Sequence, residues 1–295
     1  MTRYDPAWLD AQYNNRARVA DWAEQIDRWT RASAMVREGS ECLLDIRYGE
    51  AASSTLDLFP TDVDDAPVLV FIHGGWWRSL DKSDHSFVAS AFTDAGAMVV
   101  VPNYALCPGV SMEHIPVQLT QALAWVWRHA ADHGGDPNRI VLAGHSAGGH
   151  LAAMLSCCDW KAVGRDLPRK LIKGAMSISG VHDLAPVEQT PFLQADLRLD
   201  AAAVRRLSPV LFPPPWAGMP FHTIAGAEES EEFRRQNRAL REAWGERAVP
   251  VCEEIAGANH YTVLHDLVDP QGRSHELVRR LLGLRWYSGL QAALP

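Results

Sequence analysis

The stretch Ile140-Val-Leu-Ala-Gly-His-Ser-Ala-Gly-Gly149 decides the fold of this chain. An apolar run ends in Gly144-His-Ser-Ala-Gly148, and an apolar helical pattern follows directly. This is the pattern of a nucleophile elbow, a sharp strand-to-helix turn that presents a serine hydroxyl above a sheet. Glycines flank the serine because the strained turn leaves no room for neighbouring side chains. The sequence therefore predicts that Ser146 is a nucleophile at the start of a helix.

A second glycine-rich turn follows the apolar run Pro67–Ile72, which is predicted to be a buried strand. The turn reads His73-Gly-Gly-Trp-Trp77, a pattern typical of an oxyanion loop. Its glycines let the backbone approach a reacting carbonyl closely, whereas the histidine is expected to be structural. The amides expected to donate to an oxyanion are those of Gly74, Gly75, Trp76 and Ala147.

A histidine in the loop after the last predicted strand is the candidate general base. Residues 249–255 form that strand, and His260 follows it in the loop that begins at Ala256. The chain order serine, acid, histidine is the order expected for this arrangement. His265 and His222 are the alternatives, but they fall within a predicted helix and a predicted strand, where packed or surface histidines are common.

The carboxylate that would orient this histidine has three candidates. Glu228 and Glu229 follow the predicted strand at 221–225, and Asp183 follows the preceding strand. Both glutamates could instead belong to the acidic first turn of the helix at 231–244, which the helix dipole favours. We rank Glu229 first and Asp183 second, and the choice between them stays open.

Strand and helix patterns alternate along most of the chain, which predicts an α/β fold with a mostly parallel sheet of about eight strands and helices on both faces. One domain, residues 1–295, is expected, with a helical N-terminal arm at 1–39 and a small cap-like insertion at 182–219 over the strand ends. The predicted strands are 42–48, 54–58, 67–72, 97–101, 139–143, 173–178, 220–225 and 249–255. The predicted helices of the core are 83–94, 115–131, 146–157, 231–244 and 273–283.

Composition narrows the class of function. The chain has 295 residues, 47% of them apolar, and a formal net charge of −8. The acidic balance and the absence of a basic stripe argue against a nucleic-acid partner, and no apolar segment reaches the length of a membrane span. The glycine cluster at 144–149 lacks dinucleotide-loop spacing, so no cofactor is expected. His129 and His133 lie four apart on a predicted helix but lack a third ligand, so no metal is expected. A cytoplasmic location and a small-molecule substrate are expected, and a homodimer is left open.

Five segments together resemble one enzyme family. They are His73-Gly-Gly-Trp-Trp77, Asn103-Tyr-Ala-Leu106, Gly144-His-Ser-Ala-Gly-Gly-His-Leu151, Ser179-Gly-Val-His-Asp-Leu184 and Glu229-Ser-Glu-Glu-Phe-Arg-Arg-Gln236. This set is similar to the arylformamidase (kynurenine formamidase) branch of the α/β-hydrolases, near the hormone-sensitive-lipase-like esterases. The resemblance places the catalytic acid at Glu229, where the family more often has aspartate. The N-terminal Tyr13-Asn-Asn-Arg16 also looks like the family's N-terminal segment.

The sequence thus predicts a serine hydrolase that removes a formyl or acetyl group from an aromatic amine or alcohol through an acyl-enzyme on Ser146. Bulky rings beside the oxyanion loop would narrow the acyl side, and Trp77 and Tyr104 are the residues expected to contact the substrate. The first alternative is a general short-chain carboxylesterase. The more distant alternative is a non-catalytic receptor or interaction module on the same fold.

Overall fold

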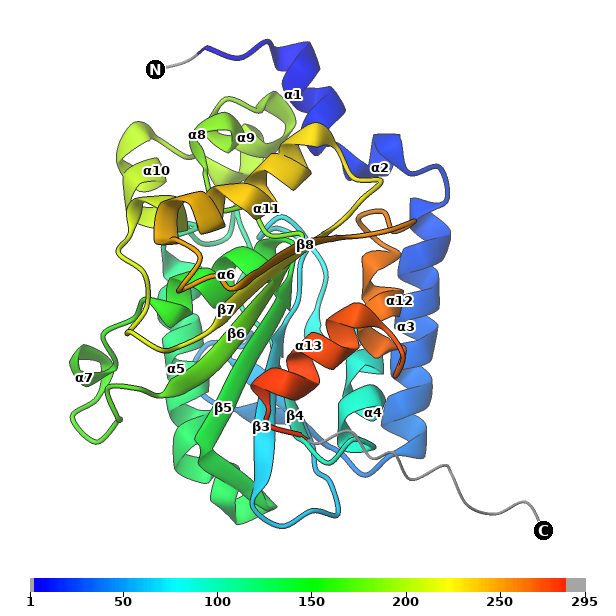
Figure 1. The fold of residues 1–295 in the computed structure, drawn as a ribbon, viewed down its shortest axis with the longest axis vertical. Coiled ribbons are helices and arrows are strands. Elements are labelled where there is room, and N and C mark those ends of the chain that lie inside the picture. Colours follow the sequence, from blue (N-terminus) through cyan, green and yellow to red (C-terminus); the bar gives the residue numbers. More distant parts are fainter. Residues whose placement is uncertain (1–2, 285–295) are drawn as a thin grey trace.

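A computed structural model describes residues 3–284; residues 1–2 and 285–295 of the predicted domain lie outside this range. An eight-stranded sheet in the order β1-β2-β4-β3-β5-β6-β7-β8 forms its centre (Figure 1). The strands pair in parallel from β4 to β8, whereas β2 runs antiparallel to both of its neighbours. The strands are β1 (Leu43–Arg47), β2 (Thr55–Phe59), β3 (Ala66–Ile72), β4 (Met98–Pro102), β5 (Gly135–His145), β6 (Ile172–Ile178), β7 (Phe221–Gly226) and β8 (Val251–Ile255). The predicted mostly parallel α/β architecture is confirmed.

Helices cover both faces of the sheet, because alternate side chains of a strand point to opposite faces. In β3, Val68, Val70 and Ile72 join the core on one face, whereas Leu69 and Phe71 join the core on the other. The first face is covered by α5 (His114–His129), α6 (Ala147–Ser156) and α11 (Glu231–Trp244). The second is covered by α3 (Trp22–Gly39), α4 (Phe87–Thr93), α12 (Val263–Val268) and α13 (Arg273–Leu281) (Figure 1).

The N-terminal arm consists of three helices, α1 (Pro6–Tyr13), α2 (Asn15–Arg18) and α3. The carboxylate of Asp5 accepts a hydrogen bond from the Ala7 amide at 3.2 Å, as expected of an N-cap followed by proline. Asn14 ends α1 and caps α2, so the chain turns there. This turn brings the arm over the carboxyl ends of the strands.

The segment 182–219 lies beside α1 at the same end of the sheet (Figure 1). It folds as four short helices rather than as strands, since its leucines and charges recur at helical spacing. These are α8 (Ala185–Glu188), α9 (Pro191–Leu197), α10 (Ala201–Leu207) and η3 (Pro209–Leu211). Three further short helices complete the part of the chain that the structure describes: α7 (Trp160–Val163), η1 (Lys82–Asp84) and η2 (Ala130–His133).

Close backbone approach at two glycines fixes α6 against the sheet. A Cβ added at Gly148 would lie 2.0 Å from the carbonyl oxygen of Ile72 in β3, and one at Gly144 would lie 2.2 Å from that of Gly148. Real side chains cannot occupy such positions, so only glycine allows the turn between β5 and α6. Between the two glycines, Ser146 has φ 58° and ψ −117°, a strained conformation for a residue with a side chain.

We therefore expect Gly148→Ala to destabilise the fold by about 1–3 kcal/mol or more, because the added methyl group overpacks a backbone contact. Gly39→Ala is the matched control, since nothing lies within 4 Å of a Cβ at the end of α3, and its effect should stay below about 1 kcal/mol. Urea unfolding of both variants measures the difference. Equal stability of the two would contradict this account of the turn.

Several histidines lie in the core and remain neutral. Burial lowers the pKa of His85 and of His182 to about 3 and that of His150 to about 4. In the unfolded chain the same groups have a pKa of about 6.5. Below about pH 6.5 the unfolded state binds more protons than the folded state. The contribution of these histidines to the free energy of unfolding is therefore fully present above about pH 6.5 and is lost as the pH falls toward their pKa values in the folded state.

The free energy of unfolding should therefore fall steeply between pH 6.5 and pH 4, by up to about 1.4 kcal/mol per pH unit for each buried histidine. Urea titrations at pH 7, 6 and 5 measure this slope. A stability that is independent of pH across this range would contradict the prediction.

Candidate active site

Ser146, His260 and Glu229 form one hydrogen-bonded chain at the carboxyl ends of the strands. The Ser146 hydroxyl donates to Nε2 of His260 at 3.1 Å, and Nδ1 of His260 donates to Oε2 of Glu229 at 2.7 Å. The three residues are 2%, 5% and 6% exposed. A buried carboxylate beside the ring favours the tautomer in which Nε2 is free to accept the serine proton. The structure thus brings together the serine, the histidine and the first-ranked acid.

The remaining oxygen of Glu229 is held by two donors. The Gly226 amide donates to Oε1 at 2.7 Å, and the Ser179 hydroxyl donates to the same atom. These bonds come from the ends of β7 and β6, the two strands that flank the acid. The extra methylene of glutamate, compared with aspartate, is therefore accommodated in a fixed orientation, with Oε2 facing His260.

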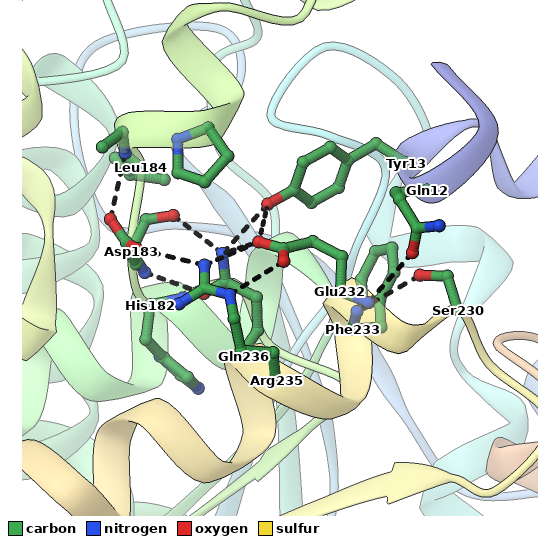
Figure 2. Close-up of polar contacts among 12 residues, drawn as sticks. Gln12, Tyr13, His182, Asp183, Leu184, Ser230, Glu232, Phe233, Arg235 and Gln236 are labelled. Carbon is green, nitrogen blue, oxygen red and sulfur yellow. Dashed lines mark hydrogen bonds and ion pairs between the residues drawn. The ribbon is translucent and has the colours of Figure 1, made fainter. Parts of the chain in front are cut away.

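The rival acids lie elsewhere. Asp183 pairs with Arg235 at 3.1 Å and accepts a hydrogen bond from the Ala185 amide, so its carboxylate is occupied away from His260 (Figure 2). Glu228 is exposed. The rival histidines are also separate, since His265 is exposed on α12 and His222 lies within β7.

His145, next to the serine, supports the loop that carries His260. Its Nε2 is 2.8 Å from the backbone carbonyl oxygen of His260, to which it donates. Burial, aided by His260 and His85, holds the pKa of His145 well below its usual value. The ring is therefore neutral, and it fixes the His260 backbone without adding charge to the site.

The oxyanion loop lies beside the serine. Gly75 has φ +108°, and Trp76 and Trp77 have φ values of 54° and 56°. The Gly75 carbonyl accepts hydrogen bonds from the amides of Arg78 and Ser79, which closes the loop into a tight turn. Gly75 and Trp76 line the cavity that contains Ser146.

Ala147 and Gly74, the two other predicted amide donors, lie close to the oxyanion loop and the serine. Ala147 is the first residue of α6, where helix amides have no intrahelical acceptor. Gly74 packs against the elbow, because a Cβ added there would lie 2.8 Å from the carbonyl oxygen of His145 and 3.1 Å from Cβ of Ser146.

Trp77 and Tyr104 do not line this cavity, which corrects the expectation that they contact the substrate. The Trp77 side chain is fully buried and packs edge-on against His150, with ring centroids 4.9 Å apart. The Tyr104 ring stacks on His73 at 4.2 Å and its hydroxyl donates to the His73 carbonyl at 2.8 Å. Both rings therefore pack beneath the oxyanion loop. The positive φ values of Trp76 and Trp77 accompany the inward direction of the Trp77 side chain.

A cavity of about 440 Å³ opens above Ser146. Apolar and aromatic side chains form much of its wall: Ile26, Trp29, Trp76, Phe192 and Tyr261. The arm contributes Tyr13–Arg16, and the insertion contributes Asp196, which faces Arg78 of the oxyanion loop. Of these wall residues, the sequence named Trp76 as a site residue and did not assign the arm or Asp196 to the site, because those segments lie far from the serine along the chain. The resemblance of Tyr13-Asn-Asn-Arg16 to a family segment pointed to the arm.

Within residues 3–284, no group of three or more His, Cys, Asp or Glu side chains is arranged to hold a metal ion. Within the same residues, no helix combines the length and the apolar character needed to cross a membrane.

Sequence comparisons agree with the geometry. The chain is 29% identical to kynurenine formamidase from Danio rerio over 254 residues, which covers 84% of each chain. It is 24% identical to kynurenine formamidase from Drosophila melanogaster, covering 75% of each. Over a shorter stretch of 102 residues, it is 41% identical to carboxylesterase NlhH from Mycobacterium tuberculosis, covering 33% of this chain and 31% of that one.

Solved structures give the same fold. A candidate thioesterase from Silicibacter sp. superimposes with a TM-score of 0.79 at 30% identity, covering 94% of this chain and 98% of that one. Esterase B from Lactobacillus rhamnosis superimposes with a TM-score of 0.71 at 20% identity, covering 94% and 96%. The sequence profile of the alpha/beta hydrolase fold matches residues 69–264, which span the elbow, the oxyanion loop and His260. The chain therefore belongs to the alpha/beta hydrolase fold family, with kynurenine formamidases and esterases among its relatives.

Proposed function

We propose that this hydrolase acts through an acyl-enzyme on Ser146. The observation that carries the proposal is the buried chain of hydrogen bonds from Ser146 through His260 to Glu229 at the floor of a cavity. His260 takes the serine proton as the oxygen attacks the substrate carbonyl, and then gives that proton to the leaving amine or alcohol. Water, activated by the same histidine, attacks the acyl carbon and releases the acid.

The amides of Gly74, Gly75, Trp76 and Ala147 are the proposed donors to the oxyanion. A negative charge develops on the carbonyl oxygen when the tetrahedral intermediate forms, and fixed amides stabilise it without reorganisation. The N-terminus of α6 adds a favourable dipole at the same place. These features favour a catalytic function over that of a non-catalytic receptor, because a receptor would not need a complete hydrogen-bonded triad.

The proposed substrate is a formyl or acetyl derivative of an aromatic amine or alcohol. Similarity to kynurenine formamidases over 84% of the chain supports it, as do the aromatic walls of the cavity. Trp76 packs edge-on against Tyr13 and Phe233, with centroids 5.6 and 6.0 Å apart, so its ring has little freedom to move. Because Trp77 is buried in the core, Trp76 is the side chain proposed to limit the length of the acyl group.

A general short-chain carboxylesterase is the second candidate. The local 41% identity to carboxylesterase NlhH favours it. The two candidates share the acyl-enzyme and differ in the leaving group and the acyl length that the cavity accepts.

We expect Glu229→Gln to lower kcat by several hundredfold or more with little change in KM, because the carboxylate acts on the orientation and charge of His260 in the transition state. Steady-state kinetics with a p-nitrophenyl ester measure both constants. Asp183→Asn is the matched control and should retain most of kcat, since Asp183 contacts Arg235 rather than the histidine. A large loss in Asp183→Asn with a nearly normal Glu229→Gln enzyme would assign the acid role to Asp183.

Catalytic efficiency on aryl esters should fall as the acyl chain grows from acetyl to hexanoyl, because added methylenes must displace the packed Trp76 ring at about 1–3 kcal/mol. Formanilide and N-formylkynurenine should be hydrolysed. Trp76→Ala should relax the chain-length preference, as each buried methylene then gains about 0.8 kcal/mol. Initial rates on this panel test the proposal, with Ser146→Ala as the inactive blank.

Efficiency that rises with chain length, together with no turnover of either formamide, would exclude the formamidase proposal and leave the esterase. Hydrolysis by Ser146→Ala near the wild-type rate would exclude both.

A further inference from the structure

Three charged side chains other than histidines line the cavity: Arg16, Arg78 and Asp196. Arg78 and Asp196 form an ion pair, and Arg78 also donates to the Phe192 carbonyl at 3.0 Å. Their charges therefore cancel, and the two contacts tie the oxyanion loop to α9.

Arg16 differs from this pair because, within residues 3–284, it has no acidic partner. Its guanidinium lies over the Trp22 ring, 4.6 Å from the centroid, in a cation–π contact that restricts the side chain without neutralising it. Arg16 is exposed and lines the cavity, so a positively charged side chain borders the substrate space.

Asn15, the neighbouring residue, is 5% exposed. It lines the main cavity and also an adjoining cavity of about 250 Å³ that reaches Glu229 and His260. The start of α2 therefore lies at the edge of both cavities.

Asn15 and Arg16 line the same cavity as His260. The leaving atom must come within hydrogen-bond reach of Nε2 of His260, which protonates it. Arg16 and the leaving portion of a bound substrate therefore share one cavity.

The arm that carries both residues is held by a buried polar network (Figure 2). The Tyr13 hydroxyl donates to Oε1 of Glu232 at 2.6 Å and accepts from Nε2 of Gln236 at 3.0 Å. The Glu232 amide donates to the Gln12 side chain at 3.0 Å, and Arg235 links Glu232 to Asp183. The end of α1 is thereby fixed to α11, so Asn15 and Arg16 are positioned before a substrate binds.

We infer that Arg16 binds a carboxylate on the leaving portion of the substrate and so determines specificity for anionic aryl amides and esters. This inference rests on the proposed function, because it needs a leaving group beside His260. Arg16 contacts no reacting atom, so its effect is on recognition of the substrate and not on the chemical step.

Two aryl acetates of matched size test the inference, 4-acetoxyphenylacetate and the neutral 4-ethylphenyl acetate. Arg16→Gln should lower kcat/KM about three- to fivefold for the anionic ester, mainly through KM, since an exposed ion pair is weak. The neutral ester should change less than twofold. Arg16→Lys should keep most of the preference, and added salt should reduce it in the wild type.

Arg31→Gln is the matched control for loss of one positive charge, because Arg31 is exposed on α3 and pairs with Asp27 at 2.7 Å. It should leave the ratio of the two esters unchanged. An equal loss on both esters in Arg16→Gln, or an unchanged ratio, would overturn the inference.

A failure of the proposed function gives a different result from a failure of the inference about Arg16. If the wild type hydrolysed neither ester, the acyl-enzyme proposal would fail. Binding of the product 4-hydroxyphenylacetate, measured by calorimetry, would still test Arg16: binding that is weaker in Arg16→Gln than in the wild type supports the inference, and equal binding overturns it.

Discussion

The sharp turn at Ser146 is the constraint on which the site depends. Gly144 and Gly148 let α6 approach β3 to a distance that no side chain would permit, and that approach holds the serine in its strained conformation. The strain persists because the sheet on one side and the helix on the other leave the turn no alternative. The same geometry places the first amides of α6 beside the serine oxygen. Folding energy in the surrounding core therefore maintains a local conformation that would be unfavourable by itself.

Charge in the buried part of the site is limited to groups that have fixed partners. Glu229 accepts three hydrogen bonds, from His260, Gly226 and Ser179, so its negative charge is stabilised despite its burial. His145 stays neutral beneath the loop that carries His260. The result is a site in which hydrogen bonds hold the groups around His260 in fixed positions.

The N-terminal arm connects the substrate cavity to the rest of the fold. Its third helix covers one face of the sheet, while its first is held against α11 by Tyr13 and Glu232. Glu232 lies one turn beyond the proposed catalytic acid on the same segment. The arm residues that line the cavity are thus anchored to α11, which begins two residues after Glu229. The shape of the cavity therefore depends on the same helix that follows the proposed acid.

Strand periodicity and glycine spacing were enough to predict the sheet, because they are local signals that packing did not override. The order of Ser146, Glu229 and His260 along the chain pointed to the candidate triad. The sequence by itself could not choose between Glu229 and Asp183, since both follow strands at the same edge and only hydrogen-bond geometry separates them. It also placed Trp77 and Tyr104 at the substrate, whereas the positive φ values of the oxyanion loop turn Trp77 into the core. Arg16 and Asp196 reach the cavity only through tertiary contacts, because both residues lie far from Ser146 along the chain and contacts of such range leave no periodic pattern in the sequence.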